Sequence, residues 1–225
     1  MTNKRSLFHI VSIVITGCLI MTWVDAVLSP NYAIKSIIKL TLFLLLPIGY
    51  SFFNKEISLI NLLRVDKKGI VFSLLLGIGV YLLIIFAYFI LVPYFDFTNI
   101  TRTLQNDIGV NKDNFVMVAI YISFINSLLE EFFFRGFAFI SLKKFASRRF
   151  AYIFSAATFS LYHIAIMKSW FTPLLFALLI TSLFVAGLLF NWLNEKDNNI
   201  YTSWIVHIGA NFAINTIGFM LFGIL

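Results

Sequence analysis

Long runs of apolar residues, separated by short polar stretches, fill almost the whole chain. A helix that crosses the hydrocarbon core of a bilayer needs about 20 mostly apolar residues. The pattern therefore predicts seven membrane-spanning helices, at about residues 7–28, 34–53, 70–92, 115–140, 150–167, 171–193 and 203–225. The expected fold class is all-α, a polytopic membrane helix bundle. Neither an internal repeat nor a low-complexity linker divides the chain, so we expect a single transmembrane domain over residues 1–225.

The composition supports this class and excludes others. Of the 225 residues, 60% are hydrophobic and 12% are charged, whereas a soluble domain has roughly 45–50% apolar and about 25% charged residues. Such a chain cannot cover a soluble surface with polar groups, which excludes an ordinary soluble enzyme. The formal charge of +7 would indicate a nucleic-acid partner only if the basic residues shared an exposed face. They are scattered between the apolar runs instead, so we expect a lipid bilayer and no nucleic acid.

The distribution of Lys and Arg between the expected spans predicts the orientation of the chain. With a cytoplasmic N-terminus, the basic residues on the cytoplasmic side are Lys4, Arg5, Lys55, Arg64, Lys67, Lys68, Lys143, Lys144, Arg148, Arg149 and Lys196. Those on the opposite side are fewer: Lys35, Lys39, Arg102, Lys112 and Lys168. We therefore predict a multi-pass protein of the cell membrane with its N-terminus in the cytoplasm. Seven spans would place the C-terminus outside, and a count that differs by one would reverse that side.

Three ionisable residues, Glu130, Glu131 and Arg135, interrupt the apolar run NSLLEEFFFRGF at residues 126–137. A charged residue at the centre of a membrane helix costs about 2.5–3.5 kcal/mol on insertion scales, and such residues usually mark a functional site. Glu131 and Arg135 are four residues apart and can pair along one helix face. Glu130 points elsewhere, because adjacent helical positions differ by about 100°. We expect an orienting Glu131–Arg135 ion pair and leave Glu130 for chemistry; alternatively, both glutamates only hold neighbouring helices together.

Two further polar motifs lie in later spans. Phe159 and His163 share a helix face in FSLYHIA (159–165), and His207 and Asn211 share one in HIGANFAIN (207–215). Each motif alone is also typical of packing, since polar side chains often hydrogen-bond across membrane helices. Their combination with the two carboxylates on three separate helices predicts one shared site.

Such a set of residues can support hydrolysis. A carboxylate in a partly dry site can act as general base on a water, with a histidine to position it. A second histidine and an amide can donate to the oxyanion of a tetrahedral intermediate. Glu130, His163 and His207 could instead hold a divalent metal such as zinc, which activates a bound water. The residues alone leave both schemes open, and the sequence contains neither the H-E-x-x-H nor the G-x-S-x-G motif of other hydrolases.

The three motifs together resemble the CAAX-processing and bacteriocin-processing membrane endopeptidases, the CPBP or Abi family. The family pattern is E-E-x-x-x-R, then F-x-x-x-H, then H-x-x-x-N. The chain has EEFFFR at 130–135, FSLYH at 159–163 and HIGAN at 207–211, in the same order. The resemblance covers about residues 115–215, which would form a four-helix catalytic core. Residues 1–110 would contribute the N-terminal spans and loops.

The resemblance implies an intramembrane endopeptidase. Its family roles carry over to Glu130 as the activating base, His163 as its partner at the water, and His207 and Asn211 as oxyanion stabilisers. Glu131, Arg135 and Phe159 would support the site. Family members are often labelled metalloproteases, and a metal-free glutamate mechanism has also been proposed for them. We favour the metal-free scheme, because Glu130 and Glu131 diverge and the chain has no H-x-x-x-H motif.

The expected substrate is a peptide or a membrane protein, and we favour a leader or signalling peptide over a prenylated CAAX tail. A family member could also act in bacteriocin self-immunity. The competing class is a non-catalytic membrane scaffold or immunity protein that binds a peptide or membrane partner. The site has one geometric requirement. His207 lies about four residues into its expected helix, and Glu130 about ten residues from the same face, so the last helix would have to tilt or begin before residue 203.

Overall fold

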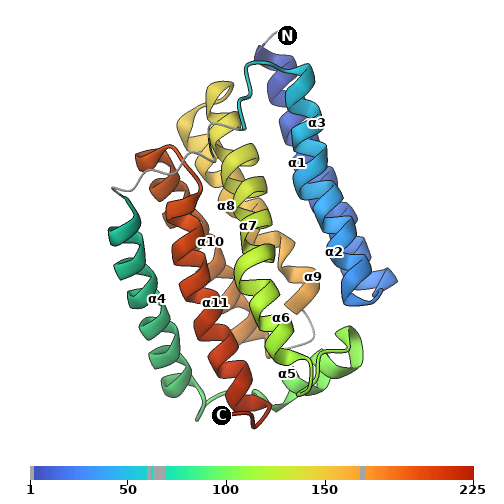
Figure 1. Cartoon of the computed structure of the whole chain (residues 1–225), viewed down its shortest axis with the longest axis vertical. Helices are drawn as coiled ribbons and strands as arrows, with labels where there is room; N and C mark the ends of the chain where they lie inside the picture. Colours follow the sequence, from blue (N-terminus) through green and yellow to red (C-terminus); the bar gives the residue numbers. More distant parts are fainter. Residues whose placement is uncertain (1–2, 60–61, 63–68, 168–170) are drawn as a thin grey trace.

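The structure is a computed structural model that describes residues 3–59, 62, 69–167 and 171–225. Within these residues the chain is a bundle of helices without strands (Figure 1). In this part of the chain, six helices are long and apolar enough to cross a membrane: Asn3–Leu28, Tyr32–Phe53, Ile70–Leu91, Phe115–Lys144, Pro173–Asp197 and Tyr201–Leu221. The predicted fold class, an all-α polytopic membrane bundle, is confirmed.

Several of these long helices change their hydrogen-bonding pattern along their length. The first consists of α1 (Asn3–Trp23) and the π-helical η1 (Val24–Leu28), and the second of α2 (Tyr32–Leu40), η2 (Thr41–Leu45) and α3 (Leu46–Phe53). The third is α4 (Ile70–Leu91), which is followed by the short α5 (Thr98–Thr103) and η5 (Leu104–Ile108). The fourth contains α6 (Phe115–Tyr121), η6 (Ile122–Asn126), α7 (Ser127–Glu130), the π-helical η7 (Glu131–Ser141) and η8 (Leu142–Lys144). The last helices are α8 (Arg148–Tyr162), α9 (Ile164–Met167), α10 (Pro173–Asp197) and α11 (Tyr201–Leu221).

The predicted fifth span, residues 150–167, is not one crossing helix. α8 has 15 residues, which at about 1.5 Å per residue makes it about 22 Å long, shorter than the roughly 30 Å hydrocarbon core. It ends at Tyr162, and α9 continues after a turn at His163. The prediction of seven spans is therefore corrected to six long helices and one interrupted passage. Figure 1 places the two termini at opposite ends of the bundle, because α8 and α9 together run through it.

The apolar core surrounds η7. Its phenylalanines are at most 4% exposed: Phe132, Phe133, Phe134, Phe137 and Phe139. Phe133 stacks on Phe43 of η2, with 4.1 Å between the ring centroids. In a membrane protein, a helix that is apolar on all sides can face either lipid or other helices. Every residue of η7 is buried, so η7 lies at the centre of the bundle, and the ionisable residues on it are enclosed by protein.

Glycines allow close packing of the helices that flank this centre. A Cβ atom on Gly209 of α11 would lie 2.5 Å from the carbonyl oxygen of Gly77 in α4. A Cβ atom on Gly187 of α10 would lie 2.9 Å from the Cα of Ala156 in α8. Small residues let membrane helices approach backbone to backbone in this way. α11 is therefore fixed against α4, and α10 against α8.

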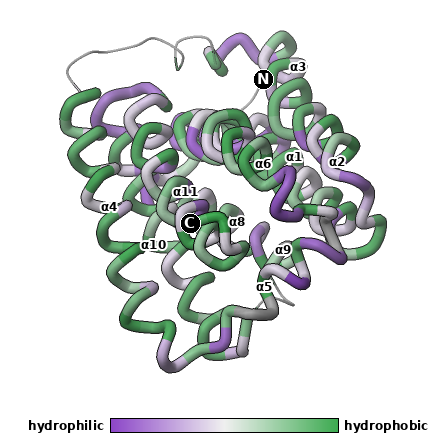
Figure 2. Tube along the Cα trace, turned by 60° about the horizontal axis from the view of Figure 1, so that its bottom comes forward, coloured by the Kyte–Doolittle hydropathy of each residue, from purple (hydrophilic) through white to green (hydrophobic). Residues whose placement is uncertain are grey.

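The outer helices present apolar surface. Figure 2 shows hydrophobic residues along α4 and α10. On α4, Val71 and Leu83 are each 65% exposed, and on α10 Leu174 is 71% exposed. These side chains suit contact with lipid. The orientation of the chain in the bilayer stays a prediction, because it depends in part on residues outside the described ranges: Arg64, Lys67, Lys68 and Lys168.

Candidate active site

The ion pair predicted between Glu131 and Arg135 is present. Both side chains are fully buried, and the Arg135 Nε lies 3.5 Å from the Glu131 Oε2. The guanidinium carbon lies 4.0 Å from the ring centroid of Phe159 and 4.9 Å from that of Phe190. Among the described residues, no hydrogen-bond acceptor meets its three nitrogens. The cation is held by one carboxylate and two aromatic faces, an arrangement that is stronger away from water.

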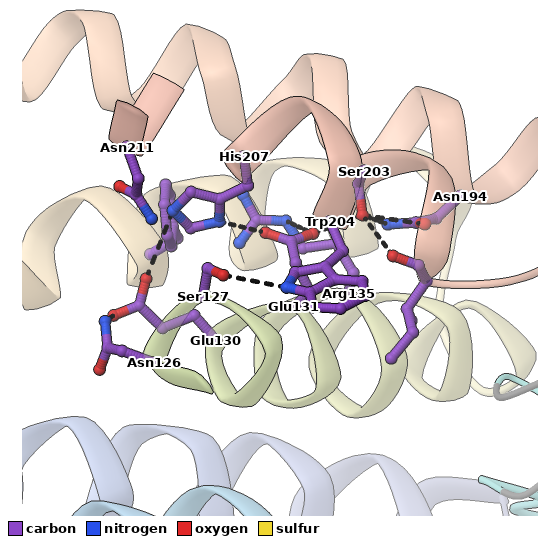
Figure 3. A network of polar contacts seen from close by, with 12 residues as sticks. Asn126, Ser127, Glu130, Glu131, Arg135, Asn194, Ser203, Trp204, His207 and Asn211 are labelled. Atoms are coloured by element: carbon purple, nitrogen blue, oxygen red, sulfur yellow. Dashed lines mark hydrogen bonds and ion pairs between the residues drawn. The ribbon is translucent and has the colours of Figure 1, made fainter. Parts of the chain in front are cut away.

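Glu131 connects η7 to α11 (Figure 3). Its Oε2 accepts a short hydrogen bond from the Ser203 hydroxyl, and its Oε1 accepts one of 2.9 Å from the His207 Nδ1. The amide of Asn194 donates to the same Ser203 hydroxyl at 2.8 Å. A carboxylate that binds one ring nitrogen fixes the orientation and the tautomer of an imidazole. In neutral His207 the proton therefore sits on Nδ1, and the lone pair on Nε2.

Glu130 has a different environment on each of its oxygens. Its Oε1 accepts hydrogen bonds from the Lys39 ammonium at 2.5 Å and from the Asn126 amide at 3.0 Å. Its Oε2 lies 3.8 Å from the Nε2 of His207, and a dashed line in Figure 3 marks this contact. This distance is too long for a direct hydrogen bond. A gap of this size between two polar groups suits a bridging water.

Sequence reasoning missed Lys39. The prediction assigned it to a segment on the outer side, but the structure places it in α2 with 5% of its surface exposed. Its ammonium also donates to the Asn126 Oδ1 at 2.5 Å. A signal was present, since Lys39 falls inside the predicted span 34–53 and an ionisable residue within a span is a functional candidate. With Lys39 included, two carboxylates and two cations balance in the site.

His163 lies at the turn between α8 and α9 and is half-buried. Its Nδ1 donates to the backbone carbonyl of Phe159 at 2.7 Å, which leaves the lone pair on Nε2 in the neutral ring. Its ring contacts that of Phe159, with 4.8 Å between centroids. Phe159 also meets the His207 ring edge to face at 6.0 Å. Among the contacts of the described side chains, none joins His163 directly to Glu130.

Asn211 projects from the same face of α11 as His207, towards the carboxylate of Glu130 (Figure 3). Its side-chain amide donates to the carbonyl of Ile122 at 3.2 Å, and an amide nitrogen has a second N–H to donate.

α11 begins at Tyr201, before the predicted start at residue 203. The His207 Nε2 lies 3.8 Å from the Glu130 Oε2, so the predicted mismatch in depth does not separate these two residues.

A metal centre does not fit the side chains as they are arranged. In the described part of the chain, no group of three or more His, Cys, Asp or Glu side chains is gathered around a point that a metal ion could occupy. The predicted ligand set of Glu130, His163 and His207 does not converge on one such point as these side chains are arranged.

Comparison with protein families connects this site to a known group. The family model described as Type II CAAX prenyl endopeptidase Rce1-like matches residues 112–213. This range contains all three predicted motifs and excludes Lys39. Searches of curated proteins and of solved structures found no match. Residues 112–213, which carry both carboxylates and the two site histidines, are thus similar to the Rce1-like family, and this similarity supports intramembrane endopeptidase activity.

Proposed function

We propose that the protein cleaves a peptide bond within the membrane by activating a water between Glu130 and His207. The observation behind this proposal is a pair of atoms without a direct hydrogen bond, the Glu130 Oε2 and the His207 Nε2, which lie 3.8 Å apart. The opposite atoms of both groups are already bound, to Lys39 and Asn126 on Glu130 and to Glu131 on His207. Both groups thus direct their unused atom to the same place.

In the proposed reaction, the Glu130 Oε2 takes a proton from the water as the water oxygen attacks the scissile carbonyl carbon. The second water hydrogen donates a hydrogen bond to the neutral His207 Nε2, and His163 keeps its own Nε2 lone pair as a further acceptor, because its Nδ1–H is held by the Phe159 carbonyl. The tetrahedral intermediate then collapses, the carbon–nitrogen bond breaks, and the proton on Glu130 passes to the leaving amine. A hydrolysis of this kind requires no group beyond the side chains and water.

The oxyanion of the intermediate needs hydrogen-bond donors. Asn211 can supply its second amide N–H. His207 keeps the lone pair of its Nε2 for the water, and the Glu131 carboxylate at 2.9 Å from its Nδ1 holds the ring in that orientation. Removing one oxyanion donor typically lowers kcat by about 10²–10³-fold. Glu131 therefore acts through His207 rather than on the substrate.

The proposed substrate is a peptide or a membrane-protein segment that reaches the site within the bilayer. The matched family is named for prenylated CAAX proteins, and a leader or signalling peptide in bacteriocin processing or self-immunity is the substrate that we favour. Both can be offered as quenched fluorescent probes, one with a farnesylated CAAX sequence and one with a double-glycine leader. The probe that is cut identifies the substrate class.

The decisive experiment compares Glu130→Gln with Glu56→Gln in protein reconstituted into liposomes. We expect Glu130→Gln to lose about 10²–10⁴-fold in cleavage rate, the typical contribution of a general base. Glu56 is exposed and lies outside the site, so the same chemical change there should leave the rate unaltered. Wild-type rates in a folded Glu130→Gln protein would contradict the mechanism. A function retained by that variant in an immunity assay would instead identify a binding scaffold.

We propose that the hydrolysis is metal-free, because in the described part of the chain no three His, Cys, Asp or Glu side chains gather around one point where a metal ion could sit. Cleavage should persist after exhaustive chelation, and elemental analysis of the purified protein should find less than one metal ion per chain. Loss of cleavage on chelation, restored by one divalent metal, would contradict this part of the proposal.

A further inference from the structure

We infer that Lys39 is a positioning residue of the proposed active site, supplied by α2 from outside the family-matched residues. Its ammonium holds the Oε1 of Glu130, so that the Oε2 faces His207 and the water between them. This inference rests on the proposed function. It adds a residue that none of the three family motifs contains.

The surroundings of Lys39 are built to hold a cation at one point. The ammonium donates to the Glu130 Oε1 and to the Asn126 Oδ1, each at 2.5 Å. It lies 5.4 Å from the ring centroid of Phe43 and 5.1 Å from that of Tyr162. Charge-assisted hydrogen bonds and aromatic faces both strengthen where water is excluded. The nitrogen therefore has a defined position rather than the mobility of an exposed lysine.

Asn126 completes the arrangement. Its Oδ1 accepts from Lys39 while its Nδ2 donates to the same Glu130 Oε1 at 3.0 Å. Lys39, Asn126 and Glu130 thus form a closed triangle in which two donors converge on one carboxylate oxygen. Such convergence fixes the rotation of the carboxylate plane, and a misplacement of about 1 Å at a reacting group can cost about 10²-fold in rate.

Lys39 also balances the negative charge of the buried Glu130 carboxylate. Glu131 faces Arg135, and Glu130 faces Lys39. If the ammonium were removed, one buried carboxylate would keep only a neutral amide and His207 as neighbours. Breaking a buried pair is strongly destabilising, so a test of positioning needs a variant that keeps the charges.

The test measures kcat and KM on whichever of the two peptide probes the wild-type protein cuts, for Lys39→Met, Lys39→Arg and Asn126→Ala. Lys35→Met is the matched control, because Lys35 lies one turn away on α2 and pairs with Asp25 at 3.2 Å, outside the site. We expect Lys39→Met to lose about 10–100-fold in kcat with KM within about twofold, because orientation and not substrate binding is lost. Lys39→Arg should recover part of the rate, since its guanidinium can still hold a carboxylate oxygen.

Asn126→Ala keeps the test valid if Lys39→Met does not fold. This variant removes no charge, and we expect about a tenfold lower kcat at unchanged KM. A folded Lys39→Met or Asn126→Ala protein with wild-type kcat would show a merely structural role. A raised kcat would show that Lys39 restrains Glu130. Either result would overturn the inference about Lys39. The proposed function would still stand if the wild-type protein cuts one of the probes. A wild-type protein that cuts neither probe would overturn both proposals.

Discussion

The adjacent glutamates of the α7–η7 helix have different hydrogen-bond partners on the two sides of the helix. On the side of α11, Glu131 is bound through both oxygens, by Ser203 and His207, and pairs with Arg135. On the side of α2, Glu130 is bound through one oxygen only, and the other lies 3.8 Å from the His207 Nε2 without a direct hydrogen bond. Chemically identical side chains thus acquire different roles from the number of donors around them. The carboxylate with all its contacts made serves as support, and the one with a free oxygen is suited to react.

The helices behind these two sides also differ. α11 is backed by α4, whose backbone it approaches closely at Gly77 and Gly209. α2 reaches the site through the long side chain of Lys39. The α11 side therefore depends on close backbone packing, and the α2 side on side-chain contacts, the Lys39–Glu130 ion pair and the stacked rings of Phe43 and Phe133. Substitutions on the first side should change stability more than those on the second.

Glu131→Gln should have the largest effect on stability. It leaves the fully buried Arg135 without a counter-charge, and breaking a buried ion pair costs about 3–5 kcal/mol. Unfolding in sodium dodecyl sulfate, followed by circular dichroism, measures this loss. Glu130→Gln should cost less, because the Lys39 ammonium keeps its hydrogen bond to the Asn126 oxygen, whereas Arg135 has no other hydrogen-bond acceptor among the described residues. Equal losses in the two variants would remove the distinction between the sides.

Ser203→Ala should have an intermediate effect. It removes a hydroxyl that donates to the buried carboxylate of Glu131, and a hydrogen bond to a charged group contributes about 1.5–3 kcal/mol. Ser182→Ala is a suitable control, since the Ser182 hydroxyl only bonds the carbonyl of Leu178 on an exposed face of α10. Its cost should stay within about 0.5 kcal/mol. The same unfolding assay applies to both, and a Ser203→Ala protein as stable as the control would contradict the prediction.

Gly209→Ala should have the smallest effect of the three. The new methyl group would meet the Gly77 carbonyl at 2.5 Å and push α4 from α11, and overpacking of this kind costs about 1–3 kcal/mol. Gly79→Ala on α4 is the control, because no atom lies within 4 Å of its added Cβ. A thermal shift assay of the pair compares them directly. Identical melting temperatures would show that the close contact does not stabilise the α11 side.

The sequence predicted most of the fold because apolar runs long enough to span a bilayer have few alternatives. It overestimated the fifth span, since hydropathy along residues 150–167 carries no sign of the turn at His163. The start of α11 at Tyr201 also differed from the prediction by two residues. Such ends are set by local hydrogen bonds and capping, which a hydropathy pattern does not register.

Within the site, sequence reasoning succeeded where spacing along one helix decides the contact. The pair of Glu131 and Arg135 follows from their separation of four residues. It failed for Lys39, whose partner Glu130 is 91 residues away in the chain, because the topology of the bundle decides that contact. It also did not anticipate that His207 would bind Glu131. The proposed catalytic roles of these residues stay predictions until they are tested.

The turn at His163 has a consequence for its own side chain. In a continuous α-helix, the backbone N–H of His163 would donate to the Phe159 carbonyl; here it donates to Ser160 at 3.2 Å, and the imidazole takes the Phe159 carbonyl instead. The end of α8 and the location of the proton on the ring thus share one acceptor, the Phe159 carbonyl. The residue at which the backbone ladder of α8 stops is also the residue whose tautomer that carbonyl selects, and NMR of ¹⁵N-labelled histidine can measure this tautomer.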